Sequence, residues 1–100
     1  MKEYIICSAI YFNDGEKHVH QPRNIETGFV VCGRRHHNCF ATFVALGVSK
    51  NDIEKIEEVQ GFLTNTDRFV DRIEGREIAI KSGQVKEEEI GKKLFSEDLY

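Results

Sequence analysis

The sequence predicts an α+β fold, a small and mainly antiparallel sheet packed with two helices, with the core completed by oligomerisation. Residues 4–12 (YIICSAIYF) are apolar at nearly every position, which is typical of a buried central strand. Two further segments carry helix start and stop signals, around Asn38 and after Asp71. The length of 100 residues suits one domain, residues 1–100, that buries limited apolar surface by itself, so we expect an assembly to extend its core.

The first strand is followed by a strong turn signal, Asn-Asp-Gly at residues 13–15. We expect residues 16–20 (EKHVH) to return as the hairpin partner of that strand. Residues 21–28 surround the only proline and indicate a loop, and residues 29–31 (FVV) indicate a short buried segment.

Asn38 is a candidate cap for a helix that runs to about Leu46, with Gly47 as its stop. Almost no position of this helix is polar, so we expect a helix buried in the core. Residues 54–65 then indicate a strand, and residues 65–67 a turn.

The second helix has clearer boundaries. Asp71 stands at the N-cap with Glu74 three residues later, the pattern of a capping box, and Gly83 is placed to end the helix. Gly75 inside this helix costs about 1 kcal/mol relative to alanine, which predicts close packing against another element.

Charge is unevenly distributed over the chain, whose net charge is −3. Residues 17–39 contain all four histidines and the basic residues Lys17, Arg23, Arg34 and Arg35 against Glu26 alone. An acidic chain with one basic patch is poorly suited to wrapping a nucleic-acid duplex and better suited to holding one small anion. No apolar run approaches a membrane span, no signal-peptide pattern is present, and we expect the three cysteines to be reduced thiols in a cytosolic setting.

The stretch CGRRHHNCF, residues 32–40, allows three functional hypotheses: a zinc site, a cysteine nucleophile and an anion site. A zinc site would use Cys32, His36, His37 and Cys39, but four ligands within eight residues are badly spaced and adjacent histidines point in different directions. A cysteine nucleophile would need a third, orienting residue that the sequence does not supply. One histidine here can also be structural, satisfying buried backbone carbonyls.

An anion site fits this stretch best. Gly33 lets the backbone approach closely, the guanidinium groups of Arg34 and Arg35 suit phosphate oxygens, and the stretch ends at a helix N-terminus. The candidate ligand-binding residues here are Arg34, Arg35, His36, His37 and Asn38.

A second candidate lies in residues 61–72, where Arg68 and Arg72 flank Phe69. An aromatic ring between two guanidinium groups is typical of a site that stacks on a base and contacts its phosphates. The alternative is that Phe69 belongs to the core and the arginines to a solvated face.

Four motifs occur in a fixed order between residue 28 and the C-terminus: RHHNCFAT, QGFLT, RFVDR and SEDLY. With them the chain resembles the first-described anti-Thoeris family of phage proteins, sponges for nucleotide signals. The resemblance implies a non-enzymatic protein without cofactor or metal, acting in the cytoplasm of the infected bacterial host. It would sequester the glycocyclic ADP-ribose isomers made by immune enzymes with TIR domains and, in some members, cyclic trinucleotides.

The resemblance also implies pockets at the interface of a homodimer, or of a hexamer built from dimers. It places the ligand-stacking aromatic at Phe69, with Arg68 beside it, and adds Phe95 and Ser96 from the C-terminal segment. We expect Arg23, Arg34 and Arg35 to bind ligand in these pockets, without assigning each arginine to a particular pocket. The alternative function is a phosphodiesterase that degrades the same messengers.

Overall fold

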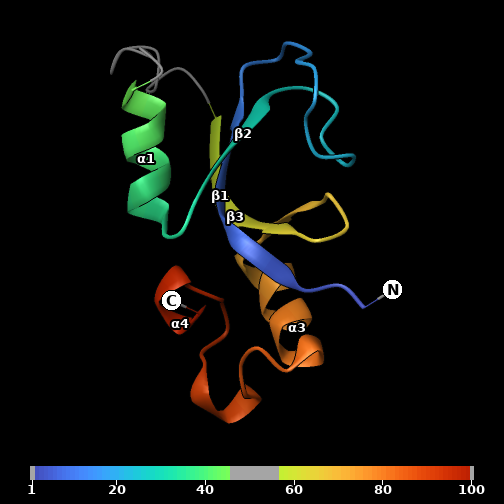
Figure 1. Ribbon diagram of the computed structural model, residues 1–100, viewed down its shortest axis with the longest axis vertical. Helices are drawn as coiled ribbons and strands as arrows, with labels where there is room; N and C mark the ends of the chain where they lie inside the picture. Colours follow the sequence, from blue (N-terminus) through green and yellow to red (C-terminus); the bar gives the residue numbers. More distant parts are fainter. Residues whose placement is uncertain (1, 46–56, 100) are drawn as a thin grey trace.

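The computed structural model describes residues 2–45 and 57–99 (Figure 1). Within these ranges four strands form one antiparallel sheet with the order β2-β1-β3-β4, and helices pack against it. The elements in chain order are β1 (Ile5–Asn13), β2 (Phe29–Gly33), α1 (His36–Ala45), β3 (Glu57–Thr64), β4 (Phe69–Asp71), α3 (Arg72–Ser82), the 3-10 helix η1 (Glu87–Glu89) and α4 (Ser96–Leu99). The predicted α+β class is confirmed. No helix in the described ranges has the length and apolar character needed to cross a membrane.

One face of the sheet carries two hydrophobic clusters. Strand register pairs Ser8 with Phe62 and Ile10 with Gln60, so these side chains share that face. The first cluster joins β1 and β2 to α1 and contains Ile10, Phe12, Val31, Cys39 and Phe43. The second joins β3 and β4 to α3 and to residues 94–99, which we call the C-terminal segment. It contains Ile5, Phe62, Val70, Ile78, Ala79 and Leu94. Figure 1 shows α1 along the upper part of the sheet, α3 along the lower part, and α4 near the start of α1.

The predicted hairpin between residues 4–12 and 16–20 is wrong. The chain does turn after β1, where the Gly15 N–H donates to Asn13 Oδ1 at 3.0 Å, but residues 16–20 form no strand and are exposed. The next strand along the chain that pairs with β1 is β2, with Phe12 opposite Phe29, and β3 pairs with the other edge of β1. Burial explains this choice, because FVVCG supplies Val31 to the core whereas EKHVH has only one apolar residue.

Helix α1 begins two residues earlier than the predicted cap. Asn38 lies in its first turn, and its Oδ1 accepts from the Arg35 N–H at 3.2 Å, so it satisfies a backbone donor from inside the helix. The prediction of a wholly buried helix is wrong: Cys39 and Phe43 are buried, but Val44 is 63% exposed. The expected helix end at Leu46, the stop at Gly47 and the strand start at residues 54–56 lie outside the described residues.

The boundaries of α3 are confirmed. Asp71 Oδ1 accepts from the backbone N–H groups of Ile73 and Glu74, and Gly83 ends the helix in the left-handed region, at φ 81°. The predicted capping box is only half formed, because the Glu74 carboxylate pairs with Arg68 instead of reaching back to the Asp71 N–H. Gly75 packs on Phe62 as expected, since a Cβ there would lie 2.9 Å from the Phe62 ring.

Candidate functional site

The C-terminal segment closes against the start of α1 through a buried histidine. His36 is 8% exposed, and its Nε2 lies 2.9 Å from the Gly61 carbonyl oxygen. A carbonyl only accepts, so Nε2 carries the proton, and Nδ1 then accepts from the Ser96 hydroxyl at 3.3 Å. Burial lowers the pKa of His36, which favours this neutral form. His36, a candidate ligand-binding residue in the sequence, therefore has the alternative, structural role, with both ring nitrogens engaged.

This histidine makes stability depend on pH. Because its folded pKa lies below the usual 6.5, the unfolded chain takes up a proton that the folded chain excludes. The contribution of His36 to the free energy of unfolding is therefore complete above about pH 6.5 and is lost as the pH falls below it. Urea unfolding at several pH values should show this loss in the wild type but not in His36→Gln, whose amide keeps a donor and an acceptor. His37→Gln, at an exposed neighbouring position, should behave like the wild type; the same loss in His36→Gln would contradict the assignment.

Arg72, the first residue of α3, joins the C-terminal segment to the sheet. Its Cζ lies 4.7 Å from the centre of the Phe95 ring, and its Nη2 donates to Gln60 Oε1 at 2.6 Å. Arg72 Nε is buried without a hydrogen-bond partner, and Phe95 is 44% exposed. A buried charged donor without a partner is costly, so this group is predisposed to bind an acceptor atom of a ligand.

Arg72 also lines a cavity of about 390 Å³ at the junction of β3, β4 and α3. The lining residues are Glu58, Val59, Gln60, Asp71, Arg72, Ile73 and Lys93. We call this the junction cavity. It combines two cations with two carboxylates, of which Asp71 caps α3 and Glu58 accepts from Gln60 Nε2 at 3.1 Å. Its volume lies in the range of small-molecule sites, about 300–1,000 Å³.

The turn between β2 and α1 holds the remaining residues of the basic stretch. The Ser8 hydroxyl donates to the Arg34 carbonyl oxygen at 2.9 Å, which fixes the backbone of the turn. Arg34, His37 and Asn38 are exposed and Arg35 is half-buried. The His36–Ser96 hydrogen bond brings this turn beside the C-terminal segment. The predicted anion residues therefore lie near Phe95 and Ser96.

Phe69 and its predicted partners lie elsewhere and are engaged in the fold. Phe69 is 7% exposed, its ring centre lies 5.7 Å from that of Tyr11, and Asn24 hydrogen-bonds both its N–H and its carbonyl. Arg68 makes two hydrogen bonds to the Glu3 carboxylate, at 2.9 and 2.8 Å, and they hold the Glu3 pKa at about 2. Arg23 Nε donates to the Thr66 carbonyl at 2.8 Å. In the described part of the chain, the Phe69 ring is therefore too buried for a ligand to stack on it.

The structure thus divides the predicted site residues into two groups. His36, Ser96 and Phe95 meet near the junction cavity, whereas Phe69, Arg68 and Arg23 form a structural network by the β3–β4 turn. Gln60 and Lys93 were not among the predicted site residues, and Arg72 was considered only as a neighbour of Phe69. One signal was present, because a cation and an aromatic ring, Lys93 and Phe95, flank the apolar Leu94.

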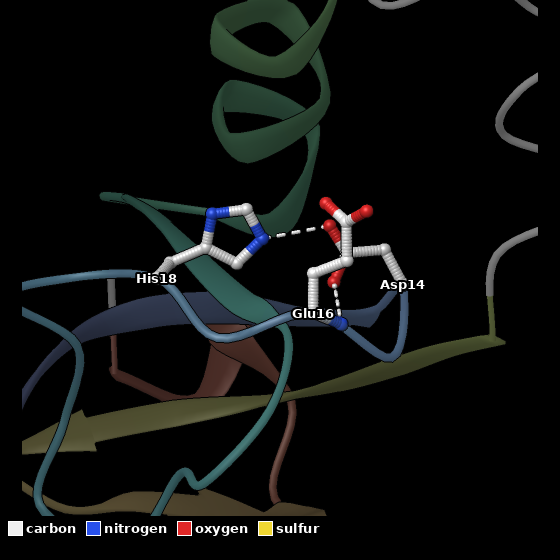
Figure 2. A group of neighbouring side chains, drawn as sticks. All are labelled: Asp14, Glu16 and His18. Atoms are coloured by element: carbon white, nitrogen blue, oxygen red, sulfur yellow. Dashed lines mark hydrogen bonds and ion pairs between the residues drawn. The ribbon is translucent and has the colours of Figure 1, made fainter.

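The four residues weighed as zinc ligands, Cys32, His36, His37 and Cys39, do not gather into a group of three or more. Among the described residues, the one group of three or more potential metal ligands is Asp14, Glu16 and His18 (Figure 2). His18 Nε2 lies 2.7 Å from Asp14 Oδ2, and the Glu16 N–H donates to Asp14 Oδ1 at 3.0 Å. This backbone hydrogen bond, followed by the contact with His18, lowers the Asp14 pKa. The geometry of an exposed turn accounts for this group without a metal.

Comparison with known proteins identifies the family. A sequence profile of the phage T4 y16D protein matches residues 4–100, nearly the whole chain. The chain belongs to the phage T4 y16D protein family. Comparisons with curated proteins and with solved structures gave no significant match. Membership of the y16D family supports the phage part of the resemblance drawn from the sequence.

Proposed function

We propose that this protein is a non-enzymatic sponge that sequesters cyclic nucleotide immune messengers and so blocks antiphage signalling. Its principal ligands would be glycocyclic isomers of ADP-ribose, with cyclic trinucleotides as a further class. The phage family of the chain and the four ordered motifs support this proposal. The observation that carries it is the Arg72 guanidinium, stacked on the exposed Phe95 ring with an unpartnered Nε beside the junction cavity.

The junction cavity offers a nucleotide the groups it needs. Arg72 and Lys93 supply positive charge for phosphate oxygens, and the carboxylates of Glu58 and Asp71 can accept from ribose hydroxyls. The exposed ring of Phe95 provides a surface on which a purine can stack. A mixed-charge cavity of this kind matches a sugar phosphate, which is both an anion and a hydroxyl donor.

The same geometry favours binding over cleavage. A general base must be able to take up a proton near neutral pH, but His36 is buried and neutral and uses both ring nitrogens within the fold. A cyclic ligand loses little conformational freedom on binding, so its affinity can be high without strain. Sequestration also requires slow release, which burial of the ligand would favour, and more so if a homodimer or hexamer closes over it.

Capture and recovery test the proposal. The purified chain is mixed with a glycocyclic ADP-ribose, separated from free ligand by gel filtration and denatured by heat, and the released nucleotide is identified by mass spectrometry. We expect nearly stoichiometric recovery of intact cyclic ligand and little retention of linear ADP-ribose. A linear product would establish the phosphodiesterase instead. Failure to retain any glycocyclic ADP-ribose or cyclic trinucleotide would overturn the proposal.

A further inference from the structure

Two of the three cysteines lie side by side on the sheet face opposite the helices. In the β1–β2 register Cys32 stands opposite Ala9, two residues from Cys7, so Cys7 and Cys32 occupy diagonal positions on the same face. Cys7 is half-buried, Cys32 is exposed, and both are free thiols. Cys39 belongs to α1 and is fully buried between that helix and the other face of the sheet, where its thiol donates to the Ser8 carbonyl oxygen at 3.6 Å.

The two neighbouring thiols shift each other's pKa in opposite directions. The interaction with Cys7 lowers the pKa of Cys32, and the same interaction, together with burial, raises the pKa of Cys7. Cys32 is therefore the more nucleophilic thiol, since the thiolate is the reactive form, and it is also the more accessible one. Burial raises the pKa of Cys39 to about 11, which makes that thiol unreactive.

We propose that Cys7 and Cys32 form a dithiol site that hydroperoxides oxidise to a disulfide joining β1 to β2. The Cys32 thiolate attacks the terminal oxygen of the hydroperoxide, the O–O bond breaks, and the alkoxide or hydroxide leaves with a proton as alcohol or water. The Cys7 sulfur then attacks the Cys32 sulfenic acid, the S–S bond forms, the S–O bond breaks, and water leaves with the Cys7 proton. Two electrons from the thiols reduce one hydroperoxide.

The placement of the pair also makes the disulfide reversible. Diagonal neighbours in a sheet have Cα atoms about 7–8 Å apart, whereas an unstrained disulfide spans at most about 7 Å. Both side chains stand on the same face of two adjacent strands, so closure needs only a small movement of the strands. Strained disulfides are readily reduced, so a dithiol reductant should restore both thiols. Neither cysteine lines the junction cavity, so this chemistry does not depend on the proposed function.

Mass spectrometry of the full chain tests the site. The reduced protein is treated with one equivalent of hydrogen peroxide, alkylated and digested. We expect the loss of two hydrogen atoms from the intact mass, a peptide pair linked through Cys7 and Cys32, and full recovery of the thiols with dithiothreitol. A Cys32–Cys39 link, a dimer joined through Cys32, or Cys32 oxidised to the sulfinic acid without a link would each overturn the proposal.

Three variants assign the roles. Cys32→Ser should abolish the reaction with peroxide. Cys7→Ser should leave Cys32 as a sulfenic acid that dimedone traps, because the second thiol is missing. Cys39→Ser is the matched control and should form the disulfide like the wild type. Equal peroxide consumption by Cys32→Ser and the wild type would show that Cys32 is not the attacking thiol.

Discussion

Replacing Gly61 by alanine should destabilise the fold by about 3 kcal/mol, at the upper end of the usual cost of overpacking. A Cβ at this position would lie 2.0 Å from the Val70 carbonyl oxygen and 2.9 Å from the Phe69 ring. Neither neighbour can move without a large cost in free energy. The Val70 carbonyl is part of the backbone of β4, which is paired with β3, and the Phe69 ring is packed on Tyr11. The Gly61 carbonyl also accepts the hydrogen bond from His36, so a shift of β3 would weaken the closure of the C-terminal segment.

Denaturant unfolding of the two proteins at neutral pH measures this effect. Gly91→Ala is the matched control, because a Cβ there meets nothing within 4 Å and the stability should change by less than about 0.5 kcal/mol. If Gly61→Ala were as stable as Gly91→Ala, the close approach of β3 and β4 at this position would be wrong. Loss of the His36 pH dependence in Gly61→Ala would further show that its carbonyl holds the ring.

Local signals explain which parts of the fold were predictable. The Asp71 cap and the Gly83 stop depend on residues within one or two turns of the helix, and the structure has both. The partner of β1 depends on which distant segment buries more apolar surface, and the turn signal at residues 13–15 carries no information about that choice. The burial of α1 was overestimated for a similar reason. Composition indicates how apolar a helix is, but not how much of it the sheet covers. The sheet covers the side of α1 with Cys39 and Phe43 and leaves Val44 exposed.

The candidate site shows the same limit more strongly. Gly61 and Ser96 lie 25 and 60 positions after His36 in the chain, so nothing in the spacing of CGRRHHNCF indicates these contacts. The Arg68–Phe69–Arg72 pattern carries no information about the orientation of its side chains. In β4, alternation turns Phe69 toward Tyr11, while Arg72 at the start of α3 reaches Phe95.

Replacing Arg72 by glutamine should weaken messenger binding by about 10- to 100-fold, the equivalent of losing one charged hydrogen bond of about 1.5–3 kcal/mol. The change removes the cation that stacks on Phe95 and the Nε that lacks a partner. Lys93→Gln should have a smaller effect, because an exposed lysine contributes a more strongly solvated charge. Isothermal titration calorimetry at low and moderate salt measures both, and the difference between wild type and variants should shrink as salt rises.

Two matched variants decide whether the junction cavity holds the ligand. Lys92→Gln removes the same charge as Lys93→Gln from an exposed neighbour that does not line the cavity, so its affinity should equal that of the wild type. Phe69→Leu keeps an apolar side chain in the packed position beside Tyr11 and should also bind normally. The opposite result, lost binding in Phe69→Leu with unchanged binding in Arg72→Gln, would place the ligand where the family resemblance puts it. An opening of the Phe69 region on assembly would then have to expose a ring that is 7% exposed in the single chain.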